Sequence, residues 1–306
     1  MTKGERLASE AALCALYLRG APVAGRPSRR RWPLVVDALC SACPSLPCLP
    51  DVLRGRGLYE ESCVLADAHL MEWALDVCAS SRATTCLDPL YPQGWLASLG
   101  SGAPPCVWVR GALPSAPAVG VVGSRVLTPS DRAFAVGTAG LVMSSGRALV
   151  SGGAAGADSV ALSAALELGG AGRCVEVLPC GLDAAPERPG VCQLSVCEPW
   201  AAFTTGQAME RNALIYSFGR RAVVVRARLR EGGTWHGAAD ALRRRLGSVL
   251  VRSLSSDPAS RALVALGAVP VTSLASLMPL LDVPVSPAQP ALFGSSVVRA
   301  PAASYG

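Results

Sequence analysis

The chain has almost no lysine: Lys3 is the single one, so arginine supplies the other 27 of its 28 basic side chains. It has two histidines and 5% aromatic residues, and its charged fraction of 16% lies below the roughly 25% of an ordinary soluble protein. Scarce histidine leaves few candidates for acid–base catalysis, and no paired carboxylate or nucleophile accompanies His69 or His236. We therefore expect no catalytic residues.

Long apolar runs are also lacking. None reaches the roughly 18 residues of a membrane-spanning helix, and the first residues do not have the pattern of a signal peptide. Twelve cysteines are present, but their spacing is not that of a secreted disulfide scaffold. We therefore expect a cytoplasmic protein with free thiols.

One cysteine cluster, Cys40, Cys43 and Cys48, stands out. It has neither a second Cys-x-x-Cys pair nor a nearby histidine, so a closed four-ligand zinc site is not visible. Cys63 or Cys78 would have to complete such a site from a distance in sequence. We predict no metal and no cofactor.

Residues 1–85 have helical apolar spacing interrupted by prolines, which predicts a small helical domain. The run Arg29-Arg30-Arg31 within it is most simply an exposed loop. Residues 283–306 are rich in proline, alanine and serine and are predicted to form a disordered tail. Helices are expected at 5–20, 32–42 and 61–80.

Residues 86–282 have a different pattern, in which short, continuously apolar runs alternate with glycine-rich turns and helical stretches. Continuously apolar strands are typical of a parallel sheet covered on both faces, and strand–helix alternation indicates a doubly wound α/β fold of Rossmann-like type. Strands are expected at 107–109, 118–122, 148–150, 174–178, 222–225 and 248–251, and helices at 130–145, 157–168, 207–218 and 234–246.

The positive charge is concentrated in one stretch. Residues 200–260 hold ten arginines against four acidic residues, a balance of +6, whereas residues 1–199 balance to −1. A localised basic surface is what a phosphate-backbone ligand requires. The alternative is a solvated face with scattered arginines.

Glycine-rich turns follow several of the predicted strands, at the sheet edge where doubly wound folds bind ligands. Gly123 permits a tight turn, and Ser124 and Arg125 offer donors to a phosphate. The next helix would be capped by Thr128 or Ser130.

A second turn, residues 151–158, contains Gly152, Gly153 and Gly156 before a helix, so that its backbone N–H groups can surround an anion. Asp158 in this turn has the ordinary interpretation of a helix cap. Gly233 and Thr234 form a third junction of this kind, and Gly181-Leu182-Asp183 a fourth.

Arg211 and Asn212 lie near the start of the apolar helix predicted at 207–218, between these turns. Arg211 is predicted to contact a phosphate and Asn212 a base edge or the nucleic-acid backbone, and the alternative is a helix cap with a surface arginine.

The order of these motifs resembles that of the DprA/Smf family (DNA-processing protein A). The resemblance covers about 190 residues and rests on seven motifs in one order, which are Asp88-Pro-Leu-Tyr91-Pro92, Gly123-Ser124-Arg125, Ser151-Gly-Gly-Ala-Ala-Gly156-Ala-Asp158, Gly181-Leu182-Asp183, Arg211-Asn212, Gly233-Thr234 and Leu266-Gly267-Ala268. It implies a Rossmann-like, non-enzymatic protein that binds single-stranded DNA, loads RecA recombinase in DNA uptake and natural transformation, and forms a homodimer.

The same resemblance implies DNA contacts at Gly123, Ser124, Arg125, Arg211 and Asn212. Leu162, Ala208 and Ala213 stand where the family usually has His, Phe and Arg, so the chain is a divergent member whose base-contacting surface differs. Phe203 or Trp235 would then supply base stacking.

Two other classes of function remain open from the sequence. One is a non-catalytic nucleotide-binding sensor or a nucleotide-processing protein similar to the LOG-type phosphoribohydrolases of the same fold superfamily, although the glutamate of their PGGxGTxxE loop is missing after Gly232-Gly233-Thr234. The other is a scaffold that binds a protein partner through the helical region.

Overall fold

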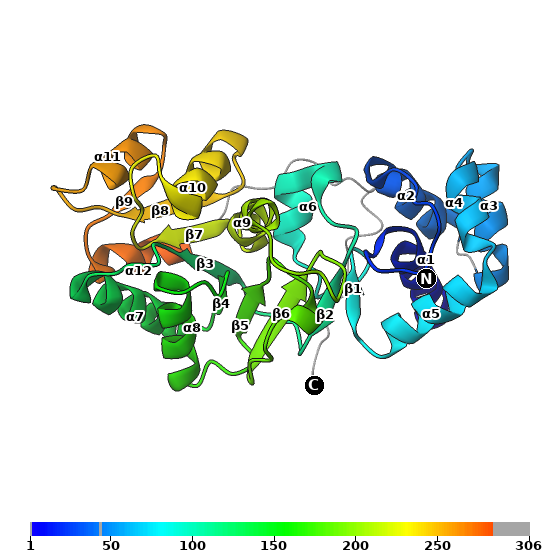
Figure 1. The fold of residues 1–306 in the computed structure, drawn as a ribbon, viewed down its shortest axis with the longest axis horizontal. Helices are drawn as coiled ribbons and strands as arrows, with labels where there is room; N and C mark the ends of the chain where they lie inside the picture. The colour runs from blue at the N-terminus through cyan, green and yellow to red at the C-terminus, as the bar shows by residue number, and fades with distance from the viewer. Residues whose placement is uncertain (1, 43–44, 284–306) are drawn as a thin grey trace.

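The computed structural model describes residues 2–42 and 45–283 and places a group of helices beside a large sheet (Figure 1). The predictions at 5–20 and 32–42 correspond to the first two helices, but the single helix predicted at 61–80 is wrong. Asp67 interrupts it, because its carboxylate accepts hydrogen bonds from the N–H groups of His69 and Leu70 and caps a new helix. The helices of this region are α1 (Lys3–Tyr17), α2 (Trp32–Ala42), α3 (Leu49–Gly55), α4 (Tyr59–Leu65) and α5 (Ala68–Ala79).

Within the described residues the sheet has nine strands, in the order β1-β2-β6-β5-β4-β3-β7-β8-β9. β2 pairs antiparallel with β1 and β6, and the strands from β6 to β9 are parallel. The strands are β1 (Ala83–Thr85), β2 (Cys106–Arg110), β3 (Ala118–Val122), β4 (Ala148–Ser151), β5 (Cys174–Val177), β6 (Val191–Ser195), β7 (Arg221–Val224), β8 (Ser248–Arg252) and β9 (Val269–Val271). The predicted Rossmann-like α/β fold with a helical N-terminal region is confirmed.

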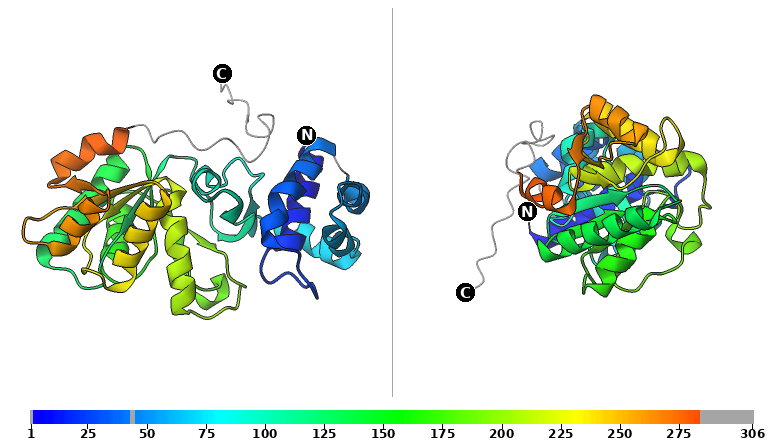
Figure 2. Two further views of the ribbon diagram at one scale, coloured as in Figure 1. Left: turned by 90° about the horizontal axis from the view of Figure 1, so that it is seen from above. Right: turned by 90° about the vertical axis from the view of Figure 1, so that its left-hand side faces the viewer.

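Helices cover both faces of the sheet (Figures 1 and 2). Val119 and Val121 of β3 pack toward α7, α8 and α12, whereas Ala118 and Val122 belong to the cluster on the opposite face, under α9 and α10. This double burial explains why the central strands are apolar throughout. The helices of this part are α6 (Gln93–Leu99), α7 (Pro129–Ser144), α8 (Ala157–Glu167), α9 (Thr205–Phe218), α10 (Gly232–Arg244), α11 (Pro258–Ala265) and α12 (Leu274–Asp282).

The strand order reverses at β3, which lies between β4 and β7. The chain proceeds from β3 through β4 and β5 to β6 on one side, and from β7 through β8 to β9 on the other. In open α/β sheets, the carboxyl ends of the strands at such a reversal form the usual ligand-binding crevice. The loops after β3, β4 and β7 therefore form the candidate ligand-binding crevice.

The helical region packs directly on the β2 side of the sheet. Leu13 and Leu16 of α1 share one apolar cluster with Val107 of β2. Indole N–H groups add polar links, because Trp108 donates to the Arg19 carbonyl at 2.7 Å and Trp32 donates to the Ser101 carbonyl at 3.0 Å. The boundary between residues 85 and 86 stays a prediction, and β1, just before it, already pairs with β2. The predicted tail lies outside the described residues except for its first residue, Val283.

Candidate nucleic-acid interface at the strand ends

Three of the predicted turns meet at the reversal of strand order. The Ser124 N–H donates to the Arg226 carbonyl after β7 at 2.9 Å, and the Ala157 N–H at the start of α8 donates to the Ser124 carbonyl at 3.1 Å. The Thr234 hydroxyl of α10 donates to the Gly123 carbonyl at 2.9 Å. The structure therefore brings the Gly123, Gly152 and Gly233 turns together, and Thr234 links two of them.

Gly156 is required by the close approach of two of these turns. Its φ of +93° lies in the region that favours glycine, and a Cβ atom there would lie 2.2 Å from the Ser124 carbonyl oxygen. It would also lie 2.5 Å from the Arg125 Cα atom. Any larger residue would separate the β3 loop from the β4 loop.

The β4 loop presents a run of free backbone donors. In the described part of the chain, the N–H groups of residues 153–156 have no hydrogen-bond acceptor, although those of Gly152, Ala157 and Ser159 are satisfied. α8 follows at once, and its N-terminus adds positive partial charge. Successive free N–H groups before a helix are an arrangement that binds anions.

Asp158 supports this loop, and its interpretation as a helix cap is wrong. Its two carboxylate oxygens accept from the Gly123 N–H and the Gly152 N–H, each at 3.1 Å, so it joins the β3 and β4 loops. Burial raises the pKa of Asp158 to about 6, while the Arg211 charge and the two N–H donors act in the opposite direction.

Arg211 lies beneath the β4 loop, and its side chain is not on the surface. The residue is 6% exposed, and a Cβ atom on Gly152 would lie 1.5 Å from its Nη1 atom. Its Nε and Nη1 atoms have no hydrogen-bond partner among the described residues. Burial lowers the pKa of the guanidinium, and the charges of Asp158 and then Glu176 oppose that shift. The alternative of a surface arginine is therefore wrong, and a phosphate contact from Arg211 stays a prediction.

Glu176 is a residue of this site that the sequence analysis missed. It is buried at the end of β5, where its Oε2 atom accepts from Gln193 at 2.9 Å and pairs with Arg188 at 3.4 Å. A Cβ atom on Gly153 would lie 1.6 Å from its Oε1 atom, so Gly153 is needed to make room. A carboxylate inside an otherwise apolar strand was the signal.

Asn212 turns toward the third loop. Its side-chain nitrogen donates to the Gly233 carbonyl at 3.2 Å, so α9 and the start of α10 are held together beside Thr234. The N-cap residue of α10, Glu231, makes no side-chain cap hydrogen bond, so its side chain does not satisfy the N–H groups of the first turn. The predicted base-edge contact of Asn212 stays a prediction.

The open side of the site carries arginines. Arg125 is exposed, and a pocket of about 430 Å³ next to it is lined by Arg132, Gly156 and Ser159. Leu162 of α8 is wholly buried in the core and therefore cannot contact a ligand. Ala208 and Ala213 are half-buried on α9.

The two aromatic residues predicted to stack on bases have different surroundings in the structure. Trp235 is 7% exposed and packs in the core, so its use as a stacking platform is wrong. Phe203 is 54% exposed in the loop before α9, and base stacking by Phe203 stays a prediction. The fourth loop has another purpose: a Cβ atom on Gly181 would lie 2.0 Å from the Pro199 carbonyl oxygen, so this glycine accommodates protein backbone.

Half of the arginines in the basic stretch of residues 200–260 have an acidic partner. Five of its ten arginines are in ion pairs, namely Arg226 and Arg252 with Asp131, Arg228 with Glu231, and Arg243 and Arg244 with Asp240. Arg221 is buried and donates to the Leu281 and Val283 carbonyls. Arg228 and Arg230 are exposed in the loop after β7, and Arg125 is exposed in the loop after β3, so exposed arginines lie on two of the loops of the site. A continuous basic surface over residues 200–260 stays a prediction.

Residues 2–42 and 45–283 contain no cluster of three histidine, cysteine or acidic side chains arranged to hold a metal ion. Cys43 of the cysteine cluster lies outside the described residues. In the same ranges, no helix combines the length and apolar character that crossing a bilayer demands.

The fold and the site define a class, a Rossmann-like protein with glycine-rich loops at the reversal of its strand order. The sequence profile of the DNA recombination-mediator protein A family matches residues 82–281, and the chain belongs to that family. No curated protein matches it in sequence.

Two solved structures share the fold. DNA processing protein A from Streptococcus pneumoniae is 20% identical, with a TM-score of 0.62 over 91% of this chain and 98% of the other. DNA processing protein A from Helicobacter pylori, whose structure describes a single-stranded DNA binding mode, is 21% identical, with a TM-score of 0.55 over 65% of this chain and 95% of the other.

Proposed function

We propose that this chain binds single-stranded DNA at the loops after β3, β4 and β7 and acts as a recombination mediator without catalysis. The observation that carries the proposal is the row of free N–H groups at residues 153–156 beside the exposed Arg125, in a member of the DNA recombination-mediator family. Backbone N–H groups and arginine are the donors that proteins use for nucleic-acid phosphates. Loading of RecA recombinase, a role in natural transformation and homodimer formation belong to the same proposal and are supported by family membership.

The binding test is a fluorescence titration of labelled dT20 at several salt concentrations. Arg125→Ala is expected to weaken binding and to reduce the log–log salt slope by about 0.7, the value for one phosphate contact on single strands. Arg54→Ala, which removes an exposed arginine on α3 in the helical region, is the matched control and should leave the slope unchanged. Absence of dT20 binding by the wild type at low salt would contradict the proposal.

The contribution of the backbone is tested without removing charge. Gly156→Ala places a methyl group against the Ser124 carbonyl and should weaken dT20 binding by about tenfold or more, because it separates the loops that carry the free donors. Gly206→Ala, in open space at the start of α9, is the control and should bind as the wild type does. Circular dichroism of both variants verifies that they are folded.

A mononucleotide screen separates the proposal from a nucleotide sensor. A large thermal shift with a mononucleotide and none with dT20 would favour the sensor.

A further inference from the structure

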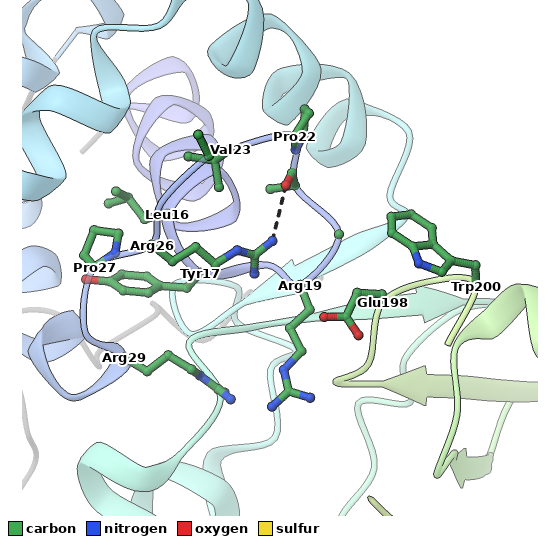
Figure 3. Close-up of a pocket in the computed structure, with 13 residues that line it drawn as sticks. Leu16, Tyr17, Arg19, Pro22, Val23, Arg26, Pro27, Arg29, Glu198 and Trp200 are labelled. Atoms are coloured by element: carbon green, nitrogen blue, oxygen red, sulfur yellow. Dashed lines mark hydrogen bonds between the residues drawn. The ribbon is translucent and has the colours of Figure 1, made fainter. Parts of the chain in front are cut away.

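A second basic pocket lies where the helical region meets the sheet. It has a volume of about 790 Å³ and is lined by the end of α1, the segment that follows it, and the loop after β6 (Figure 3). This volume lies within the range of roughly 300–1,000 Å³ that small-molecule sites occupy. Leu16 and Tyr17 form part of its wall, and Glu198 and Trp200 come from the loop after β6.

Two arginines converge in this pocket without an ion-pair partner. Figure 3 shows the Arg19 and Arg29 side chains extending toward the same space. In the described residues, neither guanidinium has a carboxylate oxygen within 4.0 Å, including that of Glu198. Desolvation and then the neighbouring Arg19 lower the pKa of Arg29. Like charges held together in this way are stabilised by a bound anion, and guanidinium groups match the oxygens of a phosphate.

The Arg29-Arg30-Arg31 run is therefore not a uniform exposed loop. It forms a short 3-10 helix, in which Arg31 pairs with Glu60 at 3.7 Å and Glu61 at 3.3 Å. Arg29 lines the pocket and Arg30 does not, although both residues are exposed. The three adjacent arginines thus have different surroundings, which supplies a matched control for any test of Arg29.

An aromatic ring stands at the same pocket. Trp200 is 68% exposed, and Gly20 brings the chain after α1 against its edge, since a Cβ atom on Gly20 would lie 3.4 Å from the Trp200 Cη2 atom. An exposed indole beside paired arginines suits a ligand that has both a phosphate and a planar base. The Glu198 carboxylate, which also lines the pocket, is an acceptor for a sugar hydroxyl or a base N–H.

The pocket also neighbours the loops of the proposed DNA site. The loop that carries Trp200 follows β6, which is parallel to β5, β4 and β3, so it lies at the same edge of the sheet as Gly123 and Gly152. Burial lowers the pKa of Arg29, and the charge of Glu210, adjacent in sequence to Arg211, is one of the smaller influences that oppose this shift. The pocket and the β3 and β4 loops therefore lie toward the same edge of the sheet.

We propose that this pocket is a second phosphate site, which holds a nucleotide by its phosphate between Arg19 and Arg29 and by its base against Trp200. The nucleotide is either free or part of the single strand bound at the β3 and β4 loops, and only the second source rests on the proposed function.

The first arm of the test titrates labelled dT20 into the wild type, Arg29→Ala and Arg30→Ala. If the strand is the source, Arg29→Ala should bind about fivefold more weakly, with a salt slope reduced by about 0.7, and Arg30→Ala should match the wild type. Arg19→Gln, which keeps most of the side-chain volume, should reproduce the effect of Arg29→Ala, and urea unfolding verifies that each variant is folded.

The second arm measures thermal shifts with dTMP and with inorganic phosphate. If a free nucleotide is the source, dTMP should raise the melting temperature of the wild type and of Arg30→Ala but not of Arg29→Ala. Trp200→Ala should reduce the dTMP shift to that of phosphate alone.

A difference between Arg29→Ala and Arg30→Ala in either arm supports the site and identifies its source. Equal behaviour of these two variants in both arms overturns it. In one outcome the wild type binds no dT20, while dTMP raises the melting temperature of the wild type but not of Arg29→Ala. The proposed function then fails and the nucleotide site stands.

Discussion

Asp158 connects the β3 and β4 loops through a carboxylate that is 5% exposed. Its pKa is raised from 3.8 to about 6 by burial, so the folded chain binds this proton more tightly than the unfolded chain does. Its contribution to the free energy of unfolding is therefore full below about pH 4 and declines as the pH rises through 6.

Asp158→Asn is expected to remove this decline. Relative to the wild type, the free energy of unfolding of the variant should rise between pH 4 and 7 by on the order of 2 to 3 kcal/mol, the equivalent of the pKa shift. Urea unfolding at pH 4, 5, 6 and 7 measures it, with the exposed Asp51→Asn as the control. A difference between variant and wild type that is constant over this range would show that the carboxyl is not desolvated as described.

Some residues of the candidate site could be predicted from the sequence alone. The glycines of the turns were identifiable because a strand followed by glycine and then a helix has few structural meanings. The roles of the buried Asp158 and Arg211 beneath these turns could not be predicted in this way. Asp158 accepts a hydrogen bond from Gly123, 35 positions away, and the Arg211 guanidinium lies against Gly152. Such contacts depend on how the strands are ordered, which local patterns do not encode.

At the scale of the element, Asp131 fastens the start of α7 to the ends of β7 and β8. The buried carboxylate pairs with Arg252 at 2.5 Å and with Arg226 at 3.2 Å, and it accepts from the Thr128 hydroxyl at 2.7 Å. Thr128 caps α7, which confirms one of the two predicted caps.

Asp131→Ala should lower the free energy of unfolding by about 3 to 5 kcal/mol, because Arg252 stays buried without its partner. Asp240→Ala is a close control: its carboxylate also joins two arginines, Arg243 and Arg244, but on the surface. That change should cost less than about 1 kcal/mol. Equal losses in urea unfolding would contradict the importance of burial here.

The elements that the sequence predicted share one property, an apolar run or helical stripe long enough to be recognised. β3, β4, β5, β7 and β8 are of this kind. β6 was missed because its Gln193 and Ser195 are polar, yet both are buried and hydrogen-bonded, Gln193 to Glu176 and Ser195 to the Cys180 carbonyl. β1 and β9 have three residues each, too few for a pattern.

At the scale of the whole molecule, the helical region and the sheet share one apolar cluster. We expect the described residues to unfold in one transition, because Leu13 and Leu16 of α1 lose their contacts when β2 leaves the sheet. Tryptophan fluorescence and far-ultraviolet circular dichroism should give the same urea midpoint. Leu13→Ala should lower the free energy of unfolding by about 2 to 5 kcal/mol, and the midpoints from the two probes should fall together. Two separate transitions would show that the regions are independent.

The antiparallel position of β2 has a consequence for how the chain is made. Its partner β6 pairs Ser195 with Trp108, so the ribosome must add 87 residues (195 − 108) before the bond network of β2 can be completed. At the usual translation rate of roughly 5–20 residues per second, one edge of β2 stays unpaired for about 4 to 17 seconds. During that interval β1 covers the other edge of β2, so the open edge of β2 is a place where the nascent chain can aggregate or be bound by a chaperone until β6 is made.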